Sequence, residues 1–145
     1  MSLIKKIIVW LGLLLSVSFA AACNAQMFVV TNKTFGITEM NLIVLRSILL
    51  GKSHLTPSGK RIMLVLPAEE DVLRRICESA GVNQWQVATS WSRQVYSEGN
   101  RMIYASDPPS VIKYLHENGG GIAVLESLDP QIMMDKNLVI VRVEE

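Results

Sequence analysis

The sequence is poor in the side chains that carry most enzyme chemistry. Its 145 residues include two cysteines and two histidines, and aromatic residues make up only 6%. His54 and His116 have no cysteine or carboxylate at the spacing of metal ligands, so we expect both on the surface. The Gly-x-Ser-x-Gly motif of serine hydrolases is also missing. We therefore predict a protein that is not an enzyme, with no catalytic residue, no metal site and no cofactor.

The first 25 residues have the pattern of a Sec signal peptide. Lys5 and Lys6 precede an apolar run over 7–15, and small residues follow up to Ala25. Such a segment directs export to the periplasm, and its cleavage leaves a predicted single domain at 27–145. The apolar run is short for a bilayer, so we expect no membrane span after cleavage.

Two other fates of this segment stay open. It can remain as an N-terminal membrane anchor. Alternatively, Ala-Ala-Ala-Cys23 acts as a lipoprotein signal, and lipidation of Cys23 anchors the protein to the outer membrane. The position three before that cysteine usually holds a large apolar residue, and here it holds Ala20. We therefore favour ordinary cleavage after Ala25.

An excess of basic residues is also lacking once this segment is removed. Residues 1–25 contain two lysines and no acid, so the remainder has 12 basic and 13 acidic residues. A net charge near −1 provides no basic field for nucleic acid or for an anionic membrane surface. We therefore predict no nucleic-acid partner.

Disulfide bonds are excluded by the same cleavage. Cys77 is then the only cysteine left, so it has no partner within the chain. Its position on the apolar side of a predicted helix favours a small buried side chain over a reactive thiol.

The rest of the sequence alternates between two hydrophobic patterns. Continuous apolar runs predict strands at 27–32, 61–67, 121–127 and 137–145. Apolar residues at helical spacing predict helices at 39–50, 68–81, 83–99 and 107–120. Strands alternating with helices predict an α/β fold, a three-layer sandwich with a mostly parallel sheet and helices on both faces.

Capping residues mark the ends of these helices. Thr38 is expected to cap the first helix, and Asp107 the last, with Pro108 at its first position. Gly81 and Gly99 are expected to end the second and third helices. The helix at 39–50 is apolar nearly all round, so it is either largely buried or presents a surface to a partner.

Three carboxylates stand where the strand at 61–67 runs into the next helix. Such a junction often binds anions, because free backbone N–H groups and the helix dipole favour negative charge there. Glu69, Glu70 and Asp71 occupy that place here. Neighbouring helical positions diverge by about 100°, so the three cannot converge on one cation.

Four short motifs, in order, resemble the phosphate-type substrate-binding proteins of ABC transporters. They are Ile48-Leu49-Leu50-Gly51-Lys52, Pro57-Ser58-Gly59, Trp91-Ser92-Arg93 and Gly121-Ile122-Ala123-Val124. The resemblance covers about residues 27–143 and is strongest to short, single-lobe members in Gram-negative bacteria. It implies one lobe of a type II periplasmic-binding-protein fold.

The chain departs from this family at the anion site. The resemblance implies an Arg and a Ser-Gly-Thr after the strand at 61–67, where this sequence has Pro67-Ala68-Glu69-Glu70-Asp71. None of the phosphate ligands can be carried over. Our first hypothesis is therefore a non-enzymatic periplasmic domain with a degenerate anion site, which has a protein-interaction or accessory role with an envelope protein partner.

The alternative hypothesis is a genuine binder of phosphate or another oxyanion, as a component of an ABC transporter. One lobe lacks the second wall of a cleft, so this function requires a homodimer or a partner lobe. Its candidate ligand-binding residues are Thr31, Asn32 and Thr34, at the end of the first strand, where open α/β sheets often bind ligands. A simple turn with a cap explains the same residues, and we prefer it.

Overall fold

The computed structural model describes residues 27–97 and 101–144. The strands are β1 (Phe28–Asn32), β2 (Glu39–Asn41), β3 (Met63–Leu66), β4 (Arg101–Tyr104), β5 (Gly121–Leu125) and β6 (Leu138–Glu144). The helices are the short 3-10 helix η2 (Lys33–Phe35), α2 (Leu42–Leu49), α3 (Glu70–Ala80), α4 (Gln84–Ser97), α5 (Pro108–Glu117) and α6 (Pro130–Met133). The predicted signal peptide and the lipidation of Cys23 lie outside the described residues.

The strands form one mixed sheet in the order β2-β6-β1-β5-β3-β4. The pairs β2–β6, β3–β4 and β3–β5 are parallel. Strand β1 is antiparallel to both of its neighbours, β5 and β6. The sheet is thus mostly parallel, which confirms the predicted α/β class, but its central strand β1 runs against the others.

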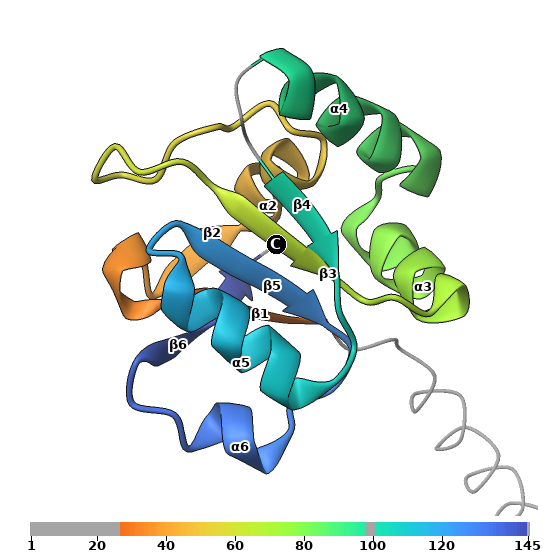
Figure 1. Ribbon diagram of the computed structural model, residues 1–145. Helices are drawn as coiled ribbons and strands as arrows, with labels where there is room; N and C mark the ends of the chain where they lie inside the picture. The colour runs from red at the N-terminus through yellow and green to blue at the C-terminus, as the bar shows by residue number, and fades with distance from the viewer. Residues whose placement is uncertain (1–26, 98–100, 145) are drawn as a thin grey trace, which may run out of the picture.

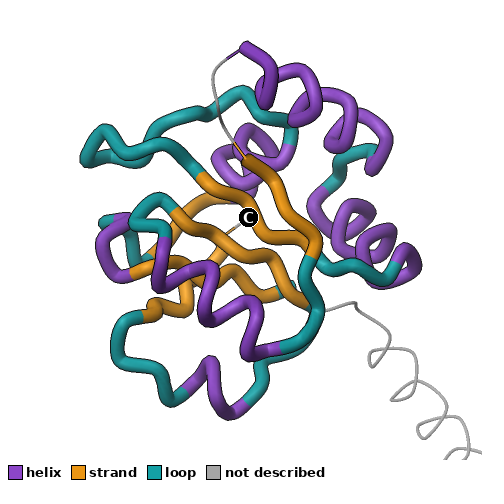
Figure 2. Tube along the Cα trace, in the orientation of Figure 1, coloured by secondary structure: helices purple, strands orange, loops and turns teal. Residues whose placement is uncertain are grey.

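Helices cover both faces of this sheet, as Figures 1 and 2 show. Buried residues of α2, α3 and α4 pack on one face, in a cluster that includes Trp91 and Cys77. Residues of α5 and α6 pack on the other face, in a smaller cluster around Leu115. The three layers are therefore confirmed, and Cys77 is buried, with 2% of its surface exposed.

Several caps form as expected. Asp107 accepts a hydrogen bond from the Ser110 backbone N–H at 3.0 Å, and Pro108 is the first residue of α5. Gly81 ends α3 with a φ of 75°, a left-handed conformation that glycine adopts without strain. Gly99, the predicted end of α4, lies outside the described residues.

The first predicted helix starts later than expected. Residues 39–41 form the short strand β2 beside β6, and the Thr38 carbonyl accepts a hydrogen bond from the Arg142 N–H at 3.1 Å. Asn41, instead of Thr38, caps α2, because its side chain accepts from the Val44 N–H at 2.8 Å. Pairing with a strand a hundred residues away overrides the local helical pattern.

The sequence pattern also missed three short elements, namely η2, β4 and α6. Strand β4 pairs with β3 at the sheet edge, and its residues are exposed or only half-buried. It therefore lacks the continuous apolar run of a buried strand. Helix α6 has only four residues, too few to show a helical period.

Candidate functional site

Polar residues gather where the parallel strands β3, β4 and β5 end. The carboxyl ends of parallel strands meet at one edge of a sheet, which is the usual ligand site of open α/β folds. Here the three strands are followed by Glu69, Ser106 and Glu126, which line a shared hollow of about 370 Å³. The resemblance places its anion site at this same strand–helix junction.

The Ser106 hydroxyl is already engaged in this hollow. It donates a hydrogen bond to the Glu69 carboxylate and accepts one from the Ala68 N–H at 2.8 Å. The bond from Ser106 is the main cause that lowers the pKa of Glu69 below its ordinary value. Glu69 is therefore a carboxylate at neutral pH, and it occupies a donor that an anion would need.

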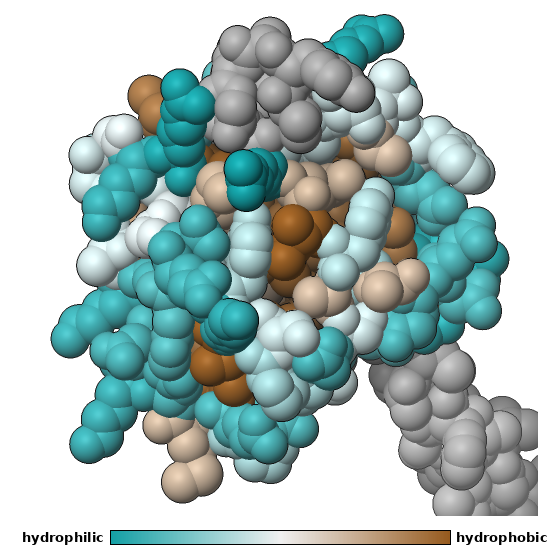
Figure 3. Space-filling view, in the orientation of Figure 1, coloured by the Kyte–Doolittle hydropathy of each residue, from teal (hydrophilic) through white to brown (hydrophobic). Residues whose placement is uncertain are grey.

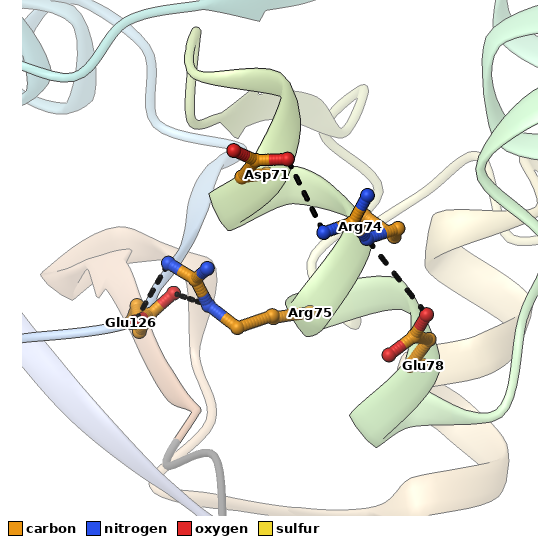
Figure 4. Close-up of polar contacts among 5 residues, drawn as sticks. All are labelled: Asp71, Arg74, Arg75, Glu78 and Glu126. Carbon is orange, nitrogen blue, oxygen red and sulfur yellow. Dashed lines mark hydrogen bonds and ion pairs between the residues drawn. The ribbon is translucent and has the colours of Figure 1, made fainter.

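An arginine of α3 is paired with Glu126, which lines this hollow. Arg75 extends from α3 to the Glu126 carboxylate, with Nε and Nη2 at 3.0 and 3.2 Å from its two oxygens (Figure 4). This bidentate bond raises the pKa of Arg75. Along the same helix, Arg74 contacts Asp71 and Glu78 at 3.2 and 4.0 Å. Both arginines are thus balanced by carboxylates.

The helix starts at this edge hold carboxylates too. Asp107 caps α5, and its hydrogen bonds with Ser110 lower its pKa. Glu70 and Asp71 occupy the first turn of α3. A phosphate dianion in the hollow would therefore meet repulsion from several charges of its own sign. Within the described ranges, no three histidine, cysteine or acidic residues are placed to hold a metal ion.

Thr31, Asn32 and Thr34 lie at the opposite edge of the sheet. Strand β1 is antiparallel to β5, and Thr31 pairs with Ile122 near the start of that strand. Thr31 is fully buried, and its hydroxyl has no hydrogen-bond partner among the described residues. These three residues therefore do not contribute to the hollow at the ends of β3, β4 and β5.

The side chains of Asn32 and Thr34, the other two candidate residues, form hydrogen bonds within the protein. Asn32 accepts from the Thr34 N–H at 2.8 Å and donates to the Leu115 carbonyl at 2.6 Å. The Thr34 hydroxyl bonds to Asn32 and to the Gly119 carbonyl. They tie β1 to the end of α5, and their role in ligand binding stays a prediction.

A second concave surface lies between α2, β2 and the loop before β3. This groove has a volume of about 590 Å³, and Phe35, Met40, Ile48 and Ile62 form its buried floor. Val44 and Leu55 also line it, and they are 42% and 59% exposed. Ile43, next along α2, is 72% exposed. The sequence pointed to the apolar surface of this helix, but not to the loop that completes the groove.

The surface over α5 and α6 is different. In the space-filling view of Figure 3, hydrophilic side chains cover most of this face, and hydrophobic ones show in a few separate areas. On this side, His116 Nε2 lies 2.8 Å from Asp135 Oδ2, an ion pair when the histidine is protonated. Met133 and Met134, at the end of α6, are exceptions on this side, with 59% and 81% of their surface exposed.

No family model matches the chain, and no curated protein matches it in sequence. Its fold is similar to that of part of two solved phosphate-transport proteins. One solved structure, from Clostridium perfringens, is described as a phosphate ABC transporter substrate-binding protein with bound phosphate. It has a TM-score of 0.55 and 14% identity over 81% of this chain and 44% of that one.

A second similar structure is an ABC-type phosphate transport receptor from Vibrio cholerae. Its TM-score is 0.56, with 11% identity over 82% of this chain and 46% of that one. The chain thus spans less than half the length of either protein, and identities this low establish the fold alone. None of the described helices is long and apolar enough to cross a membrane.

Proposed function

We propose that this protein is a non-enzymatic domain of the periplasm, with the fold of one binding-protein lobe, that acts by binding another envelope protein. The groove between α2, β2 and the loop before β3 carries this proposal. Exposed hydrophobic side chains beside a hollow with an apolar floor are typical of interaction surfaces. The signal-peptide pattern of residues 1–25 supports the location.

The groove indicates what kind of segment binds. Among the described strands, β2 lies at the end of the sheet, so one side of it has no neighbouring strand. An edge strand can pair with an extended segment of a partner, whose alternate side chains then enter adjacent pockets. Glu39 and Glu144 line the groove, and both lie close to a single cation, Arg142. This acidic rim fits an extended partner segment that alternates apolar and basic residues.

The hollow at the ends of β3, β4 and β5, called the strand-end hollow from here on, supports the second part of the proposal, a degenerate anion site. The hydroxyl of Ser106 and the guanidinium of Arg75 are groups that could bind phosphate, and both are engaged by carboxylates of the chain. We expect no saturable heat when phosphate is titrated into the purified protein by calorimetry. Saturable heat at micromolar phosphate would overturn this part.

A peptide titration tests the groove directly. The probes are two synthetic heptapeptides, one alternating valine and lysine and one alternating valine and glutamate. We expect the basic peptide to bind more tightly and to shift the NMR signals of β2, Val44 and Leu55. Equal affinity for the acidic peptide, or shifts elsewhere, would count against the groove.

Matched variants separate this surface from general hydrophobicity. Leu55→Asp places a carboxylate in the groove, whereas Ile140→Asp changes another exposed apolar residue that does not line it. Leu55→Asp is expected to lower the affinity for the basic peptide at least tenfold. Ile140→Asp is expected to keep that affinity within twofold of the wild-type value. If both variants bind like the wild type, the groove is not the binding surface.

The genuine phosphate binder remains the second candidate function. The similarity of the fold to two phosphate-transport proteins favours it. It requires the other wall of a cleft, from a homodimer or a partner lobe. Light scattering in the calorimetry buffer measures the oligomeric state. A dimer that binds phosphate would support this function over the first.

A further inference from the structure

A third hollow lies between the end of α2 and the outer side of α4. Its volume is about 420 Å³, and it is lined by Leu50, Lys52, Trp85, Gln86, Thr89, Ser90 and Arg93. It shares no residue with the strand-end hollow or with the groove. Its size is in the range of small-ligand sites.

The spacing of residues along α4 builds one wall of this hollow. Trp85, Thr89 and Arg93 are four residues apart, so they follow one another along the same side of the helix, about 6 Å per step. Val87 and Trp91, also four apart, are buried on the core side. The outer side of α4 is therefore an ordered row of an indole, a hydroxyl and a guanidinium.

Trp85 is the most exposed aromatic side chain among the residues that the structure describes. It is 69% exposed, while Trp91 on the same helix is fully buried and donates its indole N–H to the Leu49 carbonyl at 3.0 Å. Exposing an indole leaves a large apolar face in water. An exposed indole in a hollow provides a flat surface on which the C–H face of a sugar ring or another flat group can stack.

Among the described residues that line this hollow, the charged ones are basic. Lys52 and Arg93 line it, and no carboxylate is among the described residues that do. The hydroxyls of Thr89 and Ser90 and the amide of Gln86 add donors and acceptors. The hollow therefore combines an aromatic surface, neutral hydrogen-bonding groups and basic side chains.

We propose that this hollow binds an acidic saccharide. A sugar ring stacks on Trp85, its hydroxyls bond to Gln86 and Thr89, and its carboxylate or phosphate group lies beside Lys52. A free phosphate ion would contact only the basic side chains of the hollow, and a neutral sugar would contact only its indole and its uncharged polar groups. The inference rests on other residues than the proposed function, so either can fail without the other.

The test uses three probes with the purified protein: trigalacturonate, neutral maltotriose and inorganic phosphate. We expect trigalacturonate to bind saturably, to shift the indole N–H signal of Trp85 and to leave that of Trp91 unchanged. Maltotriose and phosphate are each expected to bind at least tenfold more weakly. Equal binding of the neutral sugar, or of phosphate alone, overturns the proposal, as does no binding at 10 mM trigalacturonate.

Variants at exposed positions assign the binding to this hollow. Trp85→Ala and Lys52→Gln are each expected to lower the affinity for trigalacturonate at least fivefold and to leave the unfolding transition unchanged. Lys113→Gln removes an exposed charge from α5 and serves as the control, with affinity within twofold of wild type. If Lys113→Gln weakens binding as much as Lys52→Gln, the attraction is only a general charge effect and the proposal is wrong.

Discussion

The two helical layers of this protein differ in the size of their apolar clusters and in the concave surfaces that lie beside them. On the α5–α6 side, the apolar cluster is smaller, and the surface visible over it is mostly hydrophilic apart from the exposed Met133 and Met134. On the side of α2, α3 and α4, the apolar cluster is larger, yet the groove and the Trp85 hollow both adjoin it. A layer with more apolar surface than its own packing covers is the one equipped to bind other molecules.

The largest effect is expected in the core of the α2–α4 layer. Trp91→Ala removes a fully buried side chain, so we expect the free energy of unfolding to fall by about 3–5 kcal/mol. Trp85→Ala, on the exposed side of the same helix, should change it by no more than about 0.5 kcal/mol. Urea unfolding of both variants measures the difference. Similar losses would show that Trp85 is a structural residue and not a binding surface.

The next effect concerns the connection from the α5 layer into the sheet. A Cβ at Gly120 would lie 1.9 Å from the Arg61 carbonyl oxygen, a backbone atom that cannot easily move. Gly120→Ala is expected to cost about 1–3 kcal/mol by overpacking. Gly119→Ala is the matched control, because its Cβ would meet side chains instead of backbone, the flexible end of Lys60 at 2.8 Å and the Thr34 hydroxyl at 2.9 Å. Thermal or urea unfolding should rank Gly120→Ala as the less stable of the two.

A smaller effect is expected at the contact between Asp135 and His116 on the α5–α6 side. Burial raises the pKa of Asp135, but hydrogen bonds from Asn137 and His116 outweigh it and lower that pKa overall. A lowered pKa stabilises the fold above the unfolded value, about 3.9, and that contribution is lost as the pH falls through the folded value. Asp135→Asn should therefore be less stable than wild type at pH 7, and the gap in urea midpoint should close below about pH 4. A gap that stays constant would refute this origin.

The smallest effect is expected at the strand-end hollow. Arg75 and Glu126 are partly exposed, and ion pairs in such positions contribute little to stability. Arg75→Gln should shift the urea midpoint less than either glycine substitution. The more informative measurement on this variant is phosphate binding by calorimetry. We expect no saturable heat, even though Glu126 has lost its partner. Phosphate binding gained by Glu69→Ser with Glu126→Ser would show that carboxylates alone keep the anion out.

Much of the fold could be read from short stretches of sequence. The apolar run at β5 and the helical spacing of Ile76, Cys77 and Ala80 predicted their elements, and the Asp107 cap formed as expected. These features depend on residues within a few positions of one another. Strand β4 was missed because an edge strand needs no continuous apolar run.

The candidate site was predictable only in part. The acids after β3 indicated that phosphate ligands are missing there, but their partners are far away in the chain. Ser106 is 37 residues from Glu69, and Glu126 is 51 residues from Arg75. Which of these groups meet depends on β3 lying between β5 and β4 in the sheet.

The sequence by itself determined the alternation of strands and helices, the α/β class, the burial of Cys77 and the acids at the start of α3. The tertiary structure decided that β1 is antiparallel, which places Thr31 and Asn32 at the edge away from the hollow. It also decided that 39–41 pair with β6 and that a loop beside α2 completes a groove. Periodicity and capping act within a few residues, whereas strand direction and concave surfaces arise only when distant segments pack together.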